Sequence, residues 1–411
     1  MRDVKTNNQA VSDRLNRIQP SQTSAISDKA RELKVMGRNI IGLSQGEPDF
    51  DTPDHIKVAA EDAIRKGYTR YTAVDGVPEL KEAIARKFQR DNNLTYKTSQ
   101  ITVSAGCKQL LFNAFMATLN SAEEVIIPGP YWVSYPAMVR IADGTPVIIN
   151  CSETDNFKLK PDQLEAAITP ATRWLILNSP SNPTGSVYSY SELSALAEVL
   201  IRFPHVMIIT DDIYEHLIYD DMEFHTLAQV EPDLKNRILT CNGMSKAYCM
   251  TGWRIGYGGG PEWLIRSMAK LQSQSNFHPA SISQHAAIAG LDGDLGFLQS
   301  QLTAYRGRRD RLVQELNRIN GLICHIPDGA FYVFPSCKGL YGRVTPDGIT
   351  LESDTDVVGY FLDAAGVALV PGEAFGASGY FRVSYATDIE IVSNACERLQ
   401  KASLKLVERA G

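Results

Sequence analysis

The sequence predicts an α/β fold with a mostly parallel sheet flanked by helices in a large domain, joined to a smaller α+β domain. The first observation is a series of short apolar runs without polar alternation, as expected for strands covered on both faces. Stretches long enough for helices separate these runs at residues 101–103, 124–128, 174–178, 206–210 and 237–241. The second observation is a change of pattern near residue 300. A long charged helix is expected at 304–319, and shorter mixed elements follow at 329–335 and 366–372.

Two helices are expected before the first strand. The opening 30 residues mix charged and polar side chains and are interpreted as a mobile arm. In "TPDHIKVAAEDAIRKG", Thr52 is the expected N-cap, Pro53 the first helical position and Gly67 the stop. A second apolar stripe with helical spacing runs through "PELKEAIARKFQR", at residues 78–90.

Bulk composition narrows the class of protein. The chain has 411 residues, 44% of them hydrophobic, a formal charge of −6 and a pI near 5.7, which gives no basic footprint for nucleic acid. The N-terminal residues have no apolar signal region, and no window has the length of about 18 apolar residues that a membrane span needs. Seven cysteines without a C-x-x-C pair indicate reduced thiols, so a cytoplasmic protein is expected.

The segments that follow the predicted strands carry the chemistry. They are, in order, "SAGCKQ", "GPYW", "SPSNPTG", "DDIYEH" and "NGMSK". In an open parallel sheet, ligands bind in the crevice at the carboxyl ends of the strands. We therefore expect these five segments to converge on one site.

Lys246 and Asp211 are the candidate reactive groups. A lysine beyond a strand end can enter a partly dry pocket, where desolvation lowers its pKa and allows it to attack carbonyls. Taken alone, Lys246 is more often a solvated surface charge. Asp211 ends an apolar strand and needs a cationic or donor partner, such as a protonated pyridine nitrogen. The alternative is that Asp211 is the N-cap of a helix in "DDIYEHL".

The remaining segments suit a flat ring that carries a phosphate. "SAGCKQLLFNAF" is typical of a small-residue turn that opens a helix, whose N-terminus favours a phosphate, and Arg254 can supply the counter-charge. Trp132 can stack on a ring or be an ordinary core residue. Asn182 lies between two prolines, either as a rigid ligand contact or as part of a plain loop. Together these segments indicate pyridoxal phosphate.

Six motifs occur in this order: "GEPDFDTP", "PYWVSYP", "SPSNPTG", "DDIYEHL", "SKAYCMTGWRIGY" and "FRVSYA". From about residue 14 to 400 the chain closely resembles the class I, fold type I aminotransferases, especially the bacterial aspartate aminotransferases. The resemblance implies a seven-stranded sheet in a large domain at 51–299. It implies a small domain formed by 14–50 and 300–411, and an N-terminal arm at 1–13.

The resemblance also implies how the coenzyme is held. Lys246 matches the lysine that forms a Schiff base and then shuttles the substrate proton, with Ser245 beside it. Asp211 matches the carboxylate that keeps the pyridine nitrogen protonated. Tyr214 and Asn182 match the residues that hydrogen-bond the ring's O3′.

Further matches concern the phosphate and the ring face. Arg254 and the turn at Gly106 and Cys107 match phosphate contacts. Tyr71 matches a phosphate contact that reaches across from the other subunit of a homodimer. Trp132 matches the stacking aromatic residue.

The substrate contacts follow in the same way. Arg382 matches the clamp on the α-carboxylate, helped by the backbone at Gly46, with Trp132 and Asn182 beside it. Lys108 matches a lysine that binds a distal carboxylate, or it lies in a first helical turn with its ammonium in solvent. His278 can bind an acidic side chain, act as an acid or base, or simply fill an interface.

The expected function is transfer of an amino group from an amino acid, aspartate above all, to 2-oxoglutarate by a ping-pong mechanism. The alternative is a lyase or a β- or γ-replacement enzyme with the same coenzyme and fold. Three departures from the family pattern bear on the substrate pocket: Cys107, Gln19 and the segment Asn276, Phe277 and His278.

Other classes of function are poorly supported. A binding or regulatory module would not need the reactive lysine and its partners. No metal is expected, because His216 with His225, and His278 with His285, lack a recognised ligand spacing. "GYGGGP" lacks the strand and helix context of a dinucleotide fingerprint.

Overall fold

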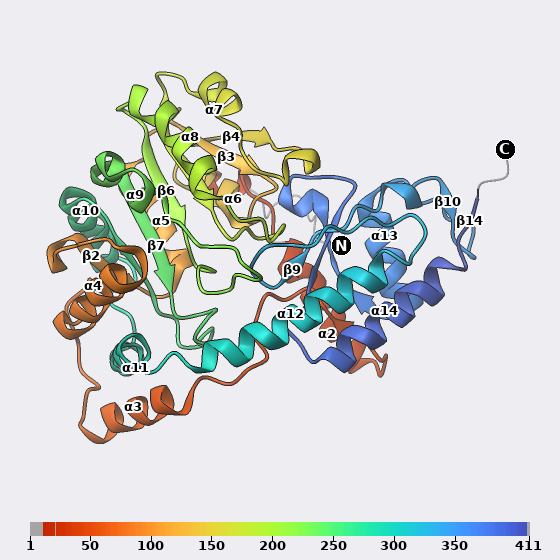
Figure 1. Cartoon of the computed structure of the whole chain (residues 1–411), viewed down its shortest axis with the longest axis horizontal. Coiled ribbons are helices and arrows are strands. Elements are labelled where there is room, and N and C mark those ends of the chain that lie inside the picture. The colour runs from red at the N-terminus through yellow and green to blue at the C-terminus, as the bar shows by residue number, and fades with distance from the viewer. Residues whose placement is uncertain (1–10, 21, 409–411) are drawn as a thin grey trace, which may run out of the picture.

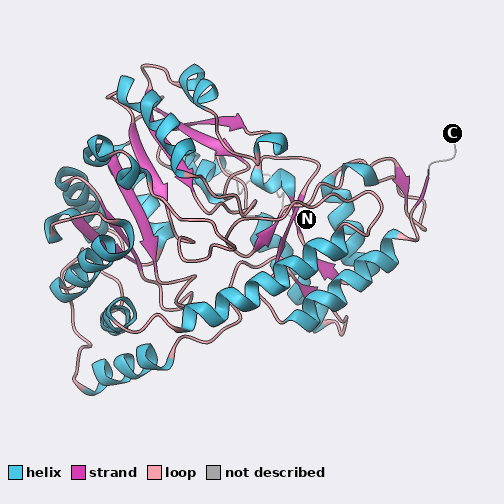
Figure 2. Cartoon of the chain, viewed as in Figure 1, coloured by secondary structure: helices cyan, strands magenta, loops and turns pink. Residues whose placement is uncertain are grey.

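A computed structural model describes residues 11–20 and 22–408, so most of the predicted N-terminal arm at 1–13 lies outside the described residues. The chain forms two lobes (Figure 1), one built around a large sheet and one of helices with short strands (Figure 2). No helix in the described ranges has the length and apolar character that crossing a membrane requires. All seven cysteines are free thiols.

The large lobe contains a sheet of seven strands in the order β2-β8-β7-β6-β5-β3-β4. Its strands are β2 (Ile101–Ser104), β3 (Glu124–Gly129), β4 (Thr145–Asn150), β5 (Thr172–Asn178), β6 (Met207–Asp211), β7 (Ile238–Gly243) and β8 (Gly256–Gly259). Only β8 runs antiparallel to its two neighbours, β2 and β7. The prediction of a mostly parallel sheet is confirmed.

The five predicted strands are present, and two strands were missed. β4 is partly exposed along its length and pairs with a single neighbour, so its sequence "TPVIIN" lacks the fully apolar signature. β8 reads "GYGG" and has almost no side chains to signal a strand. Its glycines are needed because a Cβ at Gly256 would collide with the backbone of Gly106 and Cys107, and one at Gly259 with the Tyr96 ring.

Helices cover both faces of the sheet because successive strand residues point to opposite sides. Val125 and Ile127 of β3 lie in one core cluster, and Ile126 between them lies in the other. The first cluster packs under α5 (Cys107–Thr118), α6 (Ser134–Ile141) and α10 (Glu262–Ser273). The second packs under α3 (Asp54–Arg65), α4 (Pro78–Asn92), α8 (Tyr190–Arg202) and α11 (Ser281–Asp292). Two short helices, α7 (Pro161–Ala167) and α9 (Leu227–Val230), complete this lobe.

The start of α3 differs by one residue from the prediction. Pro53 is the N-cap, without a side-chain cap, and Asp54 is the first helical residue. The Thr52 hydroxyl, expected to be the cap, instead donates a hydrogen bond of 2.7 Å to the carbonyl of Cys249. The stop at Gly67 agrees with its left-handed backbone, at φ 74°.

The small lobe has its own core around α12 (Phe297–Leu316) and α14 (Ile389–Ser403). The other helices of this lobe are α2 (Gln22–Val35) and α13 (Asp354–Tyr360), whereas α1 (Asp13–Asn16) lies against α6 of the large lobe. Its strands are β1 (Ile41–Gly42), β9 (Tyr332–Val333), β10 (Arg343–Val344), β11 (Val367–Ala368), β12 (Val370–Pro371), β13 (Phe381–Ser384) and β14 (Val407–Glu408). α12 extends into both lobes: Gln301 donates to the sulfur of Cys249, while Leu312 and Leu316 lie in the small-lobe core (Figure 1). The domain boundary predicted at residue 300 falls in the first turn of α12 and stays a prediction.

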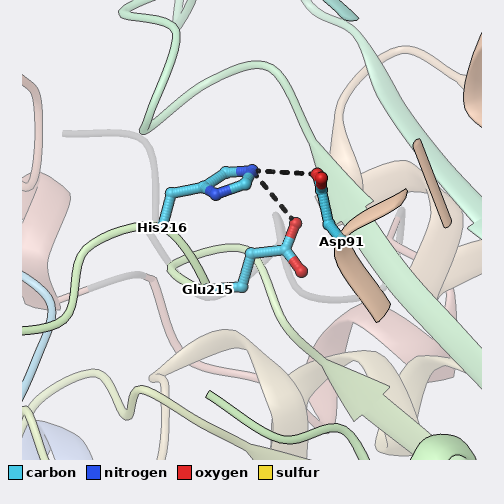
Figure 3. A group of neighbouring side chains, drawn as sticks. All are labelled: Asp91, Glu215 and His216. Atoms are coloured by element: carbon cyan, nitrogen blue, oxygen red, sulfur yellow. Dashed lines mark ion pairs between the residues drawn. The ribbon is translucent and has the colours of Figure 1, made fainter. Parts of the chain in front are cut away.

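A buried charged cluster fastens α4 to the segment after β6. Asp91, Glu215 and His216 place three possible ligand atoms within 4.8 Å of one another (Figure 3). The spacing of the histidines gave no sign of this group, because Asp91 comes from a different part of the chain. The ammonium of Lys87 contacts the Glu215 carboxylate, and both side chains are buried.

The same lysine argues against a cation at this cluster. Amide groups of Asn92 and Asn242 donate to the two oxygens of Glu215 at 2.8 Å and 2.7 Å. Burial raises the pKa of Glu215, but the charges of Lys87 and His216 and the hydrogen bond from Asn92 together outweigh this effect, so the net pKa is lowered. A metal ion would have to displace these donors and lie beside a positive charge. The cluster therefore acts as a structural ion pair.

Replacing Lys87 by methionine should lower the free energy of unfolding by about 3 to 5 kcal/mol, because Glu215 would keep a buried charge without its partner. Chemical denaturation of the two proteins measures the difference. Arg202→Met is the matched control, since Arg202 pairs with Glu165 on the surface and its loss should change little. Equal stability of Lys87→Met and the parent would contradict the ion-pair assignment.

Gly256→Ala should destabilise the fold by about 3 kcal/mol, because the new methyl group meets backbone rather than a movable side chain. Gly307→Ala in α12 provides the opposite case, since nothing lies within 4 Å of the added atom. That variant should gain about 0.5 to 1 kcal/mol from helix propensity. Thermal unfolding of both variants tests this contrast, and a loss at Gly307 as large as at Gly256 would refute it.

Candidate active site

A cavity of about 500 Å³ opens at the carboxyl ends of the parallel strands. It gathers most of the residues expected from the sequence: Gly46, Cys107, Lys108, Trp132, Asn182, Asp211, Tyr214, Ser245, Lys246, Arg254 and Arg382. Asn178 and Asp211 are the last residues of β5 and β6 and line it directly. Arg382 comes from β13 of the small lobe, so both lobes contribute to the cavity.

Lys246 follows β7 and places its amine inside the cavity. The amine donates a hydrogen bond of 2.6 Å to the carbonyl of Gly46. Burial, with help from the nearby charge of Arg382, lowers the pKa of Lys246 to about 8. The interpretation of Lys246 as a solvated surface charge is therefore wrong, and the lowered pKa makes this amine a better nucleophile near neutral pH than an ordinary lysine.

Asp211 ends β6 and is 4% exposed. The Tyr135 hydroxyl donates to its Oδ2 at 2.6 Å, and the Cys107 thiol donates to its Oδ1 at 3.7 Å. Burial raises the pKa of Asp211, and these two donors oppose the effect. Residues 213–216 form turns and no helix begins at Asp211, so the N-cap alternative for Asp211 is wrong.

Two further pairs of polar side chains line the cavity. The hydroxyls of Tyr214 and Tyr332 lie 2.8 Å apart, and burial raises the pKa of Tyr214 well above its usual value. The Arg382 guanidinium donates to Asn182 Oδ1 at 2.9 Å and lies between the rings of Tyr332 and Phe375, 4.6 Å and 4.9 Å from their centres. Its Nε is buried and has no hydrogen-bond partner among the described residues. This guanidinium can therefore donate further to a carboxylate.

The turn before α5 forms a cradle for an anion. Gly106 has φ 88°, and a Cβ there would collide with the guanidinium of Arg254. Arg254 is fixed by hydrogen bonds to the carbonyls of Thr251 at 2.8 Å and Ala105 at 3.3 Å. Gly106 is the N-cap of α5 and offers no side-chain cap. The first N–H groups of this helix and the arginine therefore meet at one place.

Trp132 and Lys108 lie together at one side of the cavity. The Lys108 ammonium is 5.0 Å from the centre of the Trp132 ring. Partial burial and the charge of Arg254 lower the pKa of Lys108. Trp132 is half-buried and lines the cavity, so it is not an ordinary core tryptophan. One face of its ring can meet a ligand.

Tyr71, His278 and Gln19 do not line the cavity of this chain. Tyr71 is 87% exposed and packs edge-on against Phe277 and His278, with ring centres 5.3 Å and 5.7 Å apart. The amide of Asn276 donates to Gln109 Oε1 at 2.8 Å, which ties this segment to the first turn of α5.

Tyr135 and Tyr332 line the cavity and were missed as site residues. Both stand in segments that the sequence made conspicuous, "PYWVSYP" and "GAFYVFP". Tyr135 lies in the first turn of α6, three residues after Trp132. Tyr332 follows no strand of the large sheet, so a search of the segments after those strands could not find it.

The cavity thus combines a nucleophilic amine, a buried carboxylate, an anion cradle and a half-buried aromatic ring. Those features fit a flat heterocycle that bears an aldehyde, a ring nitrogen and a phosphate.

The proteins that are similar to this chain agree with these features of the cavity. The chain is 55% identical over 390 residues to the aspartate/prephenate aminotransferase of Cereibacter sphaeroides, covering 95% of this chain and 98% of that protein. The structure of the aspartate aminotransferase from Rhizobium meliloti matches with a TM-score of 0.94 at 52% identity, covering 97% and 99% of the two chains. The Thermus thermophilus aspartate aminotransferase with maleate matches with a TM-score of 0.89 at 41% identity, covering 95% and 99%. The family of class I and II aminotransferases spans residues 38–399, and the chain is a member of that family.

Proposed function

We propose that this enzyme binds pyridoxal 5′-phosphate and transfers the amino group of aspartate to 2-oxoglutarate. The observation that carries the proposal is the arrangement of Lys246, Asp211 and Arg382 around one cavity of about 500 Å³. These three side chains supply an amine for an aldehyde, a counter-charge for a ring nitrogen and a fork for a carboxylate. A binding module would need none of this combination.

Different residues of the chain would bind different parts of the coenzyme. Lys246 would hold its aldehyde, with Ser245 beside it, and Asp211 would face its ring nitrogen. Tyr214 and Asn182 would bond the ring oxygen, and Trp132 would cover one ring face. Gly106, Cys107 and Arg254 would hold the phosphate. When bound, the coenzyme withdraws electrons from the substrate's α-carbon, so that a proton can leave that carbon.

Lys246 can then act as the base for this proton. With a pKa of about 8, about a tenth of its amine is deprotonated at pH 7, far more than for an ordinary lysine, and its conjugate acid can return the proton. Arg382 would orient the substrate by its α-carboxylate through the free Nε and its Nη groups. Tyr214 is held by Tyr332 and keeps its proton, so its hydroxyl remains a donor.

The substrate side chain would meet Lys108. Its ammonium lines the cavity beside Trp132, at a position suited to a distal carboxylate. The similar proteins named above are aspartate or aspartate/prephenate aminotransferases, and one structure contains maleate, a four-carbon dicarboxylate. Aspartate and glutamate therefore fit as amino donors, and prephenate is a second 2-oxo acid to test.

A second copy of the chain would complete the site. Tyr71 is 87% exposed beside Phe277 and His278, away from its own cavity, which supports a role for this aromatic group in the partner's site. We assign Tyr71 to the partner's phosphate and His278 to the partner's substrate side chain. The seven free thiols suit a reducing compartment and support a cytoplasmic location.

Incubating the purified enzyme and coenzyme with aspartate and 2-oxoglutarate should yield oxaloacetate and glutamate. Lys246→Ala should abolish this transfer, and Lys108→Met should raise the KM for aspartate about tenfold or more through the lost charged hydrogen bond. Lys34→Met, an exposed lysine of α2, should leave the KM unchanged. Chromatography of the products measures both the transfer reaction and the KM for aspartate. Release of ammonia or of a substrate leaving group in place of glutamate would favour a lyase or replacement reaction.

The reactivity of Lys246 should follow its lowered pKa. In the protein without coenzyme, acylation of its amine should rise with pH and level off above about pH 8 to 9, because only the deprotonated form reacts. Lys57 is the internal control, since its hydrogen bond to Asp54 raises its pKa above the ordinary value. Trace labelling followed by peptide mass spectrometry gives both profiles. Coincident midpoints for the two lysines would disprove the burial effect.

A further inference from the structure

The two oxygens of Asp211 are held by two different uncharged donors. Oδ2 accepts from the Tyr135 hydroxyl of α6 at 2.6 Å, and Oδ1 accepts from the Cys107 thiol of α5 at 3.7 Å. Tyr135 is 2% exposed and Asp211 is 4% exposed. The Asn178 amide also donates to the Asp211 backbone carbonyl at 2.7 Å, which fixes the chain at this point.

Asp211 needs these donors because a buried carboxylate without a partner takes up a proton. No lysine, arginine or histidine within residues 11–20 and 22–408 forms an ion pair with it, although Lys246 and Arg254 line the same cavity. The charge is thus stabilised mainly by uncharged donors, with a smaller contribution from the charge of Lys246, and it stays available to a cationic ligand.

Cys107 links the two ends of the coenzyme site. Its backbone opens α5 at the anion cradle, and its side chain turns back toward Asp211. A sulfur atom reaches farther than a hydroxyl oxygen on the same Cβ, so serine would fall short of Oδ1. A glycine or alanine here would give no donor at all.

We propose that Tyr135 and Cys107 are positioning residues, which together keep Asp211 ionised and fix the plane of its carboxylate toward the ring nitrogen of the coenzyme. This inference rests on the proposed function, because it assigns a role toward pyridoxal phosphate. Neither residue reacts with the substrate. Tyr135 is the stronger donor, since a phenolic hydroxyl bonds a carboxylate more tightly than a thiol does.

The test compares two ligands that differ only at the ring nitrogen. Dissociation constants are measured for pyridoxal phosphate and for its carbocyclic analogue, in which a C–H group replaces that nitrogen. Tyr135→Phe should weaken the binding of pyridoxal phosphate about tenfold, and Cys107→Ala about threefold, with each variant leaving the analogue within about twofold of the parent. Cys151→Ala is the control, because its thiol bonds the Ile149 carbonyl and does not line the cavity, and it should change neither constant.

If the variants weaken the binding of both ligands equally, Cys107 and Tyr135 act on the anion cradle or on folding. That result would overturn the inference. Unchanged binding of pyridoxal phosphate in both variants would overturn it as well. Failure of the parent enzyme to bind pyridoxal phosphate would instead overturn the proposed function.

Infrared spectroscopy adds a readout that needs no coenzyme and no Tyr135 variant. The S–H stretching band that disappears in Cys107→Ala should shift when Asp211 is replaced by asparagine, because the acceptor loses its charge. A band that stays in place would show that the thiol does not bond Asp211, and would overturn the role of Cys107.

Discussion

Three charged side chains share one cavity without forming ion pairs with one another, and the rest of the site depends on this separation. Lys246 donates to the Gly46 carbonyl, Asp211 accepts from Tyr135, and Arg382 donates to Asn182. Each charge is therefore stabilised by a neutral group, and its interaction with a ligand is not cancelled by a neighbour. Such charges act strongly because burial reduces screening by water. A site in which Lys246 and Asp211 paired directly would offer neither charge to a ligand.

The fold explains how these groups can be kept apart. Asp211 ends β6, and Lys246 follows the neighbouring strand β7, so both lie where the carboxyl ends of these strands open on the cavity. Arg382 comes from β13 of the small lobe, and Gly46 lies in the segment that follows β1. Two cores thus hold the parts of one site, and the distance between charges is set by packing between lobes rather than by one local motif.

The sequence alone was enough for four of the strands that pair in parallel and for most of the residues that line the cavity, whereas the parallel edge strand β4 was missed. Apolar runs mark β3, β5, β6 and β7 because both faces of these strands are buried. β8 could not be predicted from the sequence, because its residues are mainly glycines. These glycines are needed where backbone or ring atoms approach closely, and they give no pattern of apolar side chains. Tyr332 was also missed, because only the packing of the small lobe brings it to Tyr214. The contact between Asp91 and Glu215 likewise depends on tertiary structure, since 124 positions separate the two residues in the chain. Local patterns thus predicted elements and strand ends, whereas contacts between distant segments needed the fold.

α12 has a mechanical consequence. Its 20 residues extend about 30 Å, and they are attached at one end to Cys249 of the large lobe and at the other to the small-lobe core. Arg308, in the middle, grips Asp49 with two hydrogen bonds of 2.7 Å and 2.8 Å. An unbroken helix resists bending, so the two lobes do not hinge at the middle of α12. α12 is therefore a stiff connection between the large lobe, which holds Lys246, and the small lobe, which holds Arg382 on β13.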